Sequence, residues 1–262
     1  MILTNSKYLA LLLLLCVGGA GCKTFSRLTN KGGTVYTVEI QTDEPNKEEI
    51  IERAVKVIQN KINAVGLDGE VSRLPDNPNQ ISVKLYGAND AERIKKFLFT
   101  TYRLELKKAV TLTSFPQQYP TREAAEKVAT KEQEVLPYSE IDESRPPQYI
   151  VVEKQAVING EDIRDASAYS PTGGAVDYQI TFSLKRESAV KFGDWTGKNI
   201  GQYLAIVLDK KVLSVPVIKG QIFDQGTIEG RFTKASAEDI ALSLRSGYLP
   251  ATMKVLEEKP FN

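Results

Sequence analysis

Side chains that could act as nucleophiles, general bases or metal ligands are few in this sequence of 262 residues. It contains no histidine, and its two cysteines, Cys16 and Cys22, both lie near the N-terminus. This excludes Ser-His-Asp and Cys-His catalysis, histidine-ligated metals, and any disulfide or Cys-x-x-Cys pair after residue 22. We therefore expect a protein that binds or positions something, with no catalytic residues, no metal and no cofactor.

Two pairs of adjacent carboxylates are the remaining candidates for acid–base chemistry: Asp142 with Glu143, and Glu257 with Glu258. A catalytic carboxyl group needs a pKa tuned toward the working pH, which burial and neighbouring charges provide. Both pairs stand among polar residues, where carboxylates are usually solvated. We expect neither pair to be catalytic and the chain not to be an enzyme.

Two further local patterns favour a structural role over ligand binding. Gly173 and Gly174 lie in the loop sequence SPTGG and lack the strand–GxGxxG–helix context of a phosphate-binding loop. Phe192 and Trp195 are spaced as neighbours on one helix, which indicates core packing in preference to a substrate platform. Neither pattern predicts a cofactor site.

The charge balance argues against nucleic acid as a partner. The chain has 34 basic and 33 acidic side chains, a net charge of +1, whereas nucleic-acid binders usually carry a basic surplus. With 42% hydrophobic and 26% charged residues, the composition is that of an ordinary globular protein. Its length suits one or two domains.

The N-terminus has the layout of a secretory signal peptide. Lys7 precedes an apolar run over residues 8–17, and small residues at 18–21 lie directly before Cys22. The run is shorter than the roughly 20 apolar residues of a membrane-spanning helix. The small residues resemble the bacterial lipobox, in which the cysteine is acylated, with Gly19 in place of the usual aliphatic residue. An ordinary signal peptide or a short uncleaved anchor is the alternative.

We predict a lipoprotein signal peptide at residues 1–21, lipid attachment at Cys22 and a tether at 22–33. Acylation accounts for a cysteine that has no partner in the mature chain. The body of the protein would then be held to a membrane of the bacterial cell envelope, facing the periplasm or the outside. Lys23, directly after the cysteine, favours the outer membrane under the sorting rule of some Gram-negative bacteria.

Residues 34–110 alternate between strand-like and helix-like patterns. Apolar and β-branched residues predict strands over 35–40, 70–74, 81–85 and 102–106. Spacing of three and four residues predicts helices over 51–65 and 91–98. Two capping pairs precede these helices: Asn46 with Glu49, and Asn89 with Glu92. The order β-α-β-β-α-β predicts a ferredoxin-like base lobe.

Residues 111–147 interrupt this regularity. They contain five prolines and a polar stretch at 122–134 that predicts a short exposed helix. We interpret the segment as a connector between two lobes.

Residues 148–250 predict a second α+β lobe. The patterns indicate strands over 149–158, 180–184, 204–208 and 212–218, a strand pair around 225–226, and a helix over 185–195. Lys210 and Lys211 most simply occupy an exposed hairpin turn. Ser236 with Asp239 is expected to cap a last helix that Gly247 ends. A closing strand over 251–258 has no neighbour in sequence, so we expect it to return to the base lobe.

Two stretches of this second lobe resemble the large periplasmic domain of the SecD family. They are NIGQYLAIVLDKKVLSVPVIKGQI at 199–222 and DIALSLRSGYLPATMKVLEE at 239–258, with Val215 where alanine is usual. Residues 149–163 also resemble the family. In the first lobe the resemblance is mostly one of topology. Only Lys31-Gly32-Gly33 remains there of a glycine-rich family motif. The resemblance implies a ferredoxin-like base lobe with an inserted α+β head lobe.

The resemblance also implies a function. We expect a membrane-tethered, extracytoplasmic protein that binds exported polypeptide or Sec translocon components and assists protein export without catalysis. In the family, transmembrane helices follow this domain and serve proton-driven export. Because the sequence ends at Asn262, we expect the chain not to couple a proton gradient to movement itself. The alternative is a structural or assembly partner that docks on an envelope protein complex.

Overall fold

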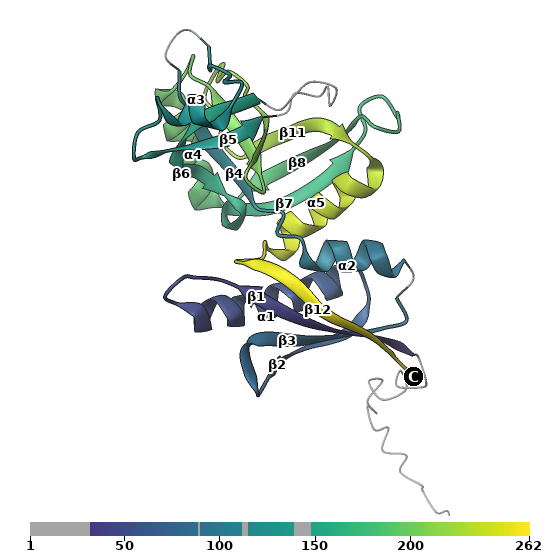
Figure 1. Ribbon diagram of the computed structural model, residues 1–262. Helices are drawn as coiled ribbons and strands as arrows, with labels where there is room; N and C mark the ends of the chain where they lie inside the picture. Colours follow the sequence, from purple (N-terminus) through teal and green to yellow (C-terminus); the bar gives the residue numbers. More distant parts are fainter. Residues whose placement is uncertain (1–31, 89, 112–114, 139–147) are drawn as a thin grey trace, which may run out of the picture. The chain divides into compact units, whose positions relative to one another are not determined.

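The computed structural model of the protein describes residues 32–88, 90–111, 115–138 and 148–262. The expected signal peptide, Cys22 and all but the end of the expected tether lie outside these residues. The described chain forms two lobes that both combine helices with mostly antiparallel sheets, which confirms the α+β class (Figure 1). We call residues 33–99 with 252–261 the base lobe, and residues 104–249 the head lobe.

The base lobe is built on a four-stranded antiparallel sheet in the order β12-β1-β3-β2. Its strands are β1 (Gly33–Gln41), β2 (Asp68–Leu74), β3 (Asn77–Tyr86) and β12 (Thr252–Phe261). Two helices connect them, α1 (Lys47–Ala64) and α2 (Ala91–Phe99). The chain therefore enters the head lobe after α2 and returns from it as β12.

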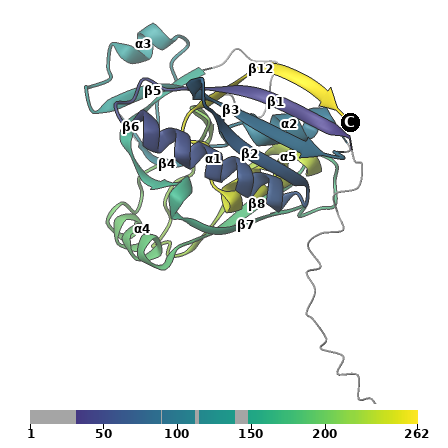
Figure 2. The same cartoon turned by 90° about the horizontal axis from the view of Figure 1, so that it is seen from below.

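The core of the base lobe lies between this sheet and its two helices (Figures 1 and 2). Alternate residues of β1, among them Tyr36, Val38 and Ile40, are buried, as expected for a strand covered on one face. The apolar stripe of α1 packs on them through residues such as Ile58, because apolar residues three and four apart share one helix face.

The strand predicted at 102–106 does not join this sheet, so the predicted base lobe was wrong at its C-terminal end. Residues Leu104–Ala109 form β4, a strand of the head lobe that pairs with β6 and β9. Four consecutive β4 residues are buried, whereas an edge strand of the base sheet would expose one face. The edge of the base sheet beside β1 is formed by β12, which pairs with the whole of β1. The expected return of residues 251–258 to the base lobe is therefore confirmed.

The head lobe contains a five-stranded barrel in the order β10-β5-β6-β4-β9. Besides β4, its strands are β5 (Gln133–Tyr138), β6 (Gln148–Asn159), β9 (Leu204–Leu208) and β10 (Lys211–Ser214). Small and branched residues such as Ala109, Val152 and Val207 fill it. The predicted strand over 212–218 is shorter than expected, since residues 216–218 pair with 202–204 outside it.

The predicted connector at 111–147 is wrong in part, because its described residues contribute to the head lobe. The short helix expected there is present as α3 (Arg122–Glu126), and β5 follows it as a barrel strand. β5 pairs along its length with β6. Pro137 argued against a strand here, because proline cannot donate a hydrogen bond to a neighbouring strand. It is tolerated in β5 because β10, the neighbour on the second side, pairs with β5 only at Tyr138.

A second, three-stranded sheet completes the head lobe in the order β11-β8-β7. Its strands are β7 (Ile163–Tyr169), β8 (Tyr178–Leu184) and β11 (Gln225–Phe232). A 3-10 turn at Gly160–Asp162 leads into β7. Helix α5 (Lys234–Ser246) covers one face of this sheet, and α4 (Arg186–Lys198) follows β8 (Figure 1). Gln225 and Gly226 begin β11 and do not form the predicted hairpin turn.

The helix ends correct the predicted cap of α5 and refine that of α1. Thr233 caps α5 by accepting a hydrogen bond from the backbone N–H of Ser236 at 3.2 Å, so Ser236 is not the cap. Asp90 caps α2; the predicted cap, Asn89, lies outside the described residues. Asn46 is the N-cap residue of α1, as predicted, but its side-chain amide donates to the Glu49 carboxylate at 3.2 Å and makes no cap bond to the described backbone. Gly247 ends α5 at a φ of 98°, as predicted.

The two lobes meet where α1 and α2 face α5. Arg93 of α2 donates to the carboxylate of Asp239 of α5 at 2.9 Å. Arg53 of α1 pairs with Glu161 and lies 4.7 Å from the ring centre of Tyr248. Asp239 therefore joins the lobes. The sequence had suggested that it helps to cap α5, which it does not do.

Lys61 is the most deeply buried cation at this junction. Its side chain is 0% exposed, and its Nζ donates to the carbonyl oxygens of Phe97 at 3.1 Å and Thr100 at 2.8 Å. The rings of Phe97 and Tyr102 lie 5.2 and 5.3 Å from the same atom. Burial lowers the pKa of Lys61 to about 7, and the distant carboxylates of Asp209 and Asp239 offset this only partly.

This buried lysine predicts a pH-dependent stability. Above about pH 7 the folded protein releases the Lys61 proton while the unfolded chain, with a pKa near 10.5, retains it. The free energy of unfolding should therefore rise with pH by up to about 1.4 kcal/mol per unit from this group. Urea denaturation between about pH 6 and 9 would show the rise, and Lys61→Met should remove it.

The matched control is Lys56→Met, which changes an exposed lysine of the same helix. It should keep the wild-type pH profile. Parallel profiles for wild type and Lys61→Met would contradict the assignment.

Candidate functional site

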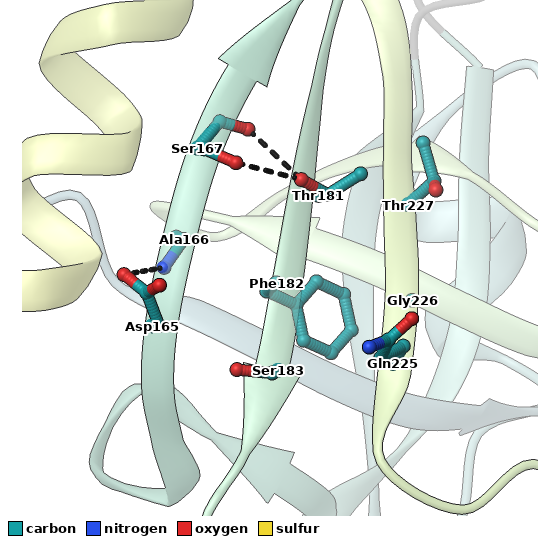
Figure 3. Close-up of a pocket in the computed structure, with 9 residues that line it drawn as sticks. All are labelled: Asp165, Ala166, Ser167, Thr181, Phe182, Ser183, Gln225, Gly226 and Thr227. Carbon is teal, nitrogen blue, oxygen red and sulfur yellow. Dashed lines mark hydrogen bonds between the residues drawn. The ribbon is translucent and has the colours of Figure 1, made fainter.

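One face of the three-stranded sheet in the head lobe is open and polar. Along β8, Ile180, Phe182 and Leu184 are buried toward the core, so the intervening residues Thr181 and Ser183 point to the opposite face. A hollow of about 370 Å³ lies on this side (Figure 3). Its lining comes from all three strands: Asp165, Ala166, Ser167, Thr181, Phe182, Ser183, Gln225, Gly226 and Thr227.

The hollow offers hydroxyl and amide groups and one carboxylate. The hydroxyls of Ser167 and Thr181 lie 3.0 Å apart, and Thr181 also donates to the carbonyl of Ser167 at 3.2 Å (Figure 3). Asp165 accepts from the backbone N–H of Ala166 at 2.9 Å. No general base contacts either hydroxyl among the residues that line the hollow. This arrangement can donate and accept hydrogen bonds but has no activated nucleophile.

The hollow ends at a strand edge that has no described partner. β11 is the outermost strand of the sheet, and within the described ranges no strand pairs with its outer side. The backbone of Gln225 and Thr227 therefore belongs both to the hollow and to this edge. An unpaired strand edge presents a row of main-chain donors and acceptors that another extended chain can complete.

Exposed apolar side chains occur directly before β11, on α4 and in two further segments of the head lobe. Phe223 is 57% exposed and covers Gly193 of α4, where an added Cβ would approach the ring to 2.7 Å. Val190, one helical turn before Gly193, is 58% exposed. Ile200 and Val217 are exposed in the segments that follow α4 and β10. Phe223 therefore places apolar surface directly before the polar edge of β11.

A buried ion network lies on the other side of the head lobe, at the barrel. Lys107 is 1% exposed; its Nζ pairs with Glu134 and with Glu105 at 3.3 Å, and donates to the Lys154 carbonyl at 2.7 Å. Lys210 pairs with Glu134 at 3.1 Å. These cations lower the pKa of Glu134 against the effect of its burial. Arg103 also pairs with Glu105 at 3.3 Å, so both carboxylates have cations as partners, as expected for buried charges that serve the fold.

A second hollow of about 730 Å³ lies beside this network, between α3, β5 and the β9–β10 turn. Asp209 and Lys210 form the turn with φ angles of 48° and 63°, a conformation that is uncommon outside glycine. The side chain of Asp209 accepts from the backbone N–H of Arg103 at 2.9 Å, which fixes the turn against the lobe junction. Lys210 thus lies in a hairpin turn, as predicted, but is not merely solvated.

The residues singled out in the sequence are not brought together into a catalytic site. Glu258 pairs with Lys95 at 2.8 Å, and Glu257 with Lys259 at 2.7 Å, so the two carboxylates serve exposed ion pairs. Cys22, Asp142 and Glu143 lie outside the described residues. Within residues 32–262, apart from the undescribed gaps, no group of three Asp, Glu, Cys or His side chains could hold a metal.

The predicted structural residues occupy structural positions. Phe192 is 2% exposed in the main core, and Trp195 packs against that core. Gly173 and Gly174 lie in the loop between β7 and β8, where Asp177 accepts hydrogen bonds from Ser170 and Thr172. These bonds lower the pKa of Asp177 and close the loop on itself.

Comparison with known proteins identifies what the head lobe is similar to. The family model described as the SecDF P1 head subdomain matches residues 133–251. The matched range begins at the first residue of β5 and includes β11 and α5. It therefore contains the open sheet face, its free edge and the apolar residues beside it.

Curated relatives extend the similarity into the base lobe. The protein translocase subunit SecD of Aquifex aeolicus (strain VF5) is 39% identical over 214 residues, which are 81% of this chain and 40% of that protein. The SecD of Koribacter versatilis (strain Ellin345) is 34% identical over 217 residues, 81% of this chain and 39% of that protein. The chain thus spans about 40% of the length of these relatives.

Solved structures share the fold. A crystal structure of SecDF in its super-membrane-facing form has a TM-score of 0.66 at 28% identity, covering 88% of this chain and 30% of that one. A second chain, from a structure of SecDF as a membrane component that enhances protein export, has a TM-score of 0.63 at 28% identity. The match covers 85% of this chain and 98% of that one.

Proposed function

Because the chain contains a periplasmic head domain of the SecD family, we propose that it assists protein export by binding polypeptide outside the cytoplasm. The observation that carries this proposal is the match of residues 133–251 to the head-domain model. Relatives of the chain are named as protein translocase subunits, and one structural relative is described as enhancing protein export. Exported polypeptide and components of the Sec translocon are the partners that we propose.

The chemistry of the head lobe supports a non-enzymatic role. Its open sheet face carries hydroxyls, an amide and a single carboxylate, and the outer edge of β11, which pairs with no other described strand, carries further main-chain groups. Main-chain hydrogen bonding does not depend on the side chains of the partner. A surface of this kind suits the transient binding of many different sequences, which export requires.

The finer architecture also belongs to this proposal. We assign the base lobe to the ferredoxin-like fold, with β12 as the fourth strand of the β-α-β-β-α-β unit and the head lobe inserted before it. The antiparallel order β12-β1-β3-β2 supports the assignment. None of the described helices is long and apolar enough to span a membrane.

We further propose that a lipid on Cys22 holds the protein at the membrane of the cell envelope. The support is the sequence alone: a short apolar run and four small residues directly before a cysteine. About ten residues separate Cys22 from the start of the base lobe, enough for an extended reach of roughly 35 Å. The preference for the outer membrane stays a prediction from Lys23.

The polypeptide-binding proposal predicts a preference for unfolded chains. The full-length protein in detergent micelles should bind fluorescently labelled, reduced and carboxymethylated α-lactalbumin, with a dissociation constant in the micromolar range or below, measured by fluorescence anisotropy. The matched control is the same α-lactalbumin with its disulfides intact, which is folded and should bind at least about tenfold more weakly. Equal binding of both forms, or binding of neither, would remove this activity.

The anchor proposal predicts a loss of lipid on substitution of one residue. Cys22→Ser should abolish acylation and move the protein from the membrane fraction to the soluble fraction, because Ser lacks the thiol to which the lipid is attached. Cys16→Ser is the matched control and should leave acylation intact. Mass spectrometry of both variants decides it: a Cys22→Ser protein that still carries diacylglycerol would contradict the assignment.

A further inference from the structure

We propose that the edge of β11 is the place where the head lobe takes up polypeptide, by adding an extended segment of an unfolded chain as a further strand. The inference rests on the proposed function and names the site and the form of the bound chain. It concerns the first half of β11, from Gln225 to Ile228.

The register of the sheet shows which main-chain groups are available. The N–H of Leu184 in β8 donates to the carbonyl of Asp224 at 2.7 Å, and these two residues are opposite each other. In an antiparallel pair the residues alternate between facing the partner strand and facing away. Gly226 and Ile228 therefore bond β8, whereas the N–H and C=O groups of Gln225 and Thr227 point to the outer side.

The other exposed strand edges are obstructed by side chains. On β7, Arg245 donates to the carbonyl of Ala166 at 2.8 Å. On β5, Arg122 donates to the carbonyl of Val135 at 3.1 Å. On β2, Gln59 donates to the carbonyl of Gly69 at 3.2 Å. Such contacts, like charged residues and prolines, keep strand edges from pairing with other chains.

β12 is protected in a different way. It contains Lys254 and Lys259, Pro260 has no backbone N–H to donate, and the register with β1 shifts after Thr37. These are the features that blunt an edge strand. Residues 225–228 of β11 are Gln, Gly, Thr and Ile, with no proline and no charge. Compared with the described edges of β2, β5, β7 and β12, residues 225–228 of β11 therefore carry none of these obstructing features.

Side chains beside the edge indicate what the added segment contains. Phe223 is exposed two residues before the start of β11, so an apolar side chain at that end of the bound segment would lose contact with water. Thr227 lies on the open polar face, where a hydroxyl or amide side chain of the segment finds partners. An extended, uncharged segment with an apolar residue at one end fits this surface.

The first test needs no mutation. Amide hydrogen exchange of the full-length protein is followed with and without saturating reduced, carboxymethylated α-lactalbumin. The outward amides of Gln225 and Thr227 should exchange at least about tenfold more slowly in the complex, because they acquire acceptors. The inward amides of Gly226 and Ile228, already bonded to β8, should change little. Unchanged exchange at residues 225 and 227 in the complex would overturn the site.

The second test is a substitution at the outward position. Thr227→Pro removes the outward N–H without removing a bond to β8, a placement that proline tolerates on an edge strand. It should weaken binding of the same probe by about tenfold. Thr227→Ala keeps the N–H and removes only the hydroxyl and methyl, so it should bind within about twofold of wild type.

The outcomes separate this site from the proposed function. If wild type binds the probe and Thr227→Pro binds equally well, the edge of β11 is not the site, while polypeptide binding stands. If wild type does not bind the probe at all, the proposed function itself falls. Binding lost in Thr227→Pro and kept in Thr227→Ala supports strand addition.

Discussion

The pairing of β12 with β1 is the constraint on which the rest of the structure depends. These strands stand at the two ends of the described chain, and they pair along the whole of β1. Closing so long a loop costs entropy, which the ladder and the burial of residues such as Val38 and Val255 offset. Because the sheet is completed only by this return, the head lobe is an insertion joined to the base lobe by two crossings. The contacts at these crossings follow from that topology. They are the ion pair of Arg93 with Asp239 and the hydrogen bond from Lys61 to the carbonyl of Thr100, directly after α2.

Most elements were predictable because their apolar residues repeat with a clear period. The stripe of α1, the alternation of β1 and β8 and the apolar run of β9 all identify the correct element. What a period cannot identify is the sheet that a strand joins. β4 follows α2 closely in sequence, yet it pairs with β6 and β9, since its residues are buried on both faces. The predicted cap pair of α5 failed for a related reason: Asp239 has a tertiary partner in Arg93.

The candidate site was predictable only in kind. Composition argued only against histidine- and cysteine-dependent chemistry, and the motifs of residues 199–258 led to the family, which the head-domain match confirms. The free edge of β11 could not be predicted, because an edge is defined by the absence of a neighbour, and neighbours are set by long-range pairing. The buried network left a signal that was missed: Glu105 and Lys107 are opposite charges two apart in β4, beside the buried Leu104 and Leu106. Two charges on one face of a buried strand indicate an ion network.

The central claim is that the head lobe receives exported polypeptide. Its most direct test is photo-crosslinking in intact cells from a probe amino acid at Val190, exposed on α4 one turn before the glycine that Phe223 covers, compared with the same probe at Lys56, exposed on the base lobe. Pulse-labelled cells should show transient crosslinks from Val190 to many newly exported chains, and few from Lys56. Crosslinks from Val190 to one stoichiometric envelope protein, or none above those from Lys56, would contradict the account and favour a docking role.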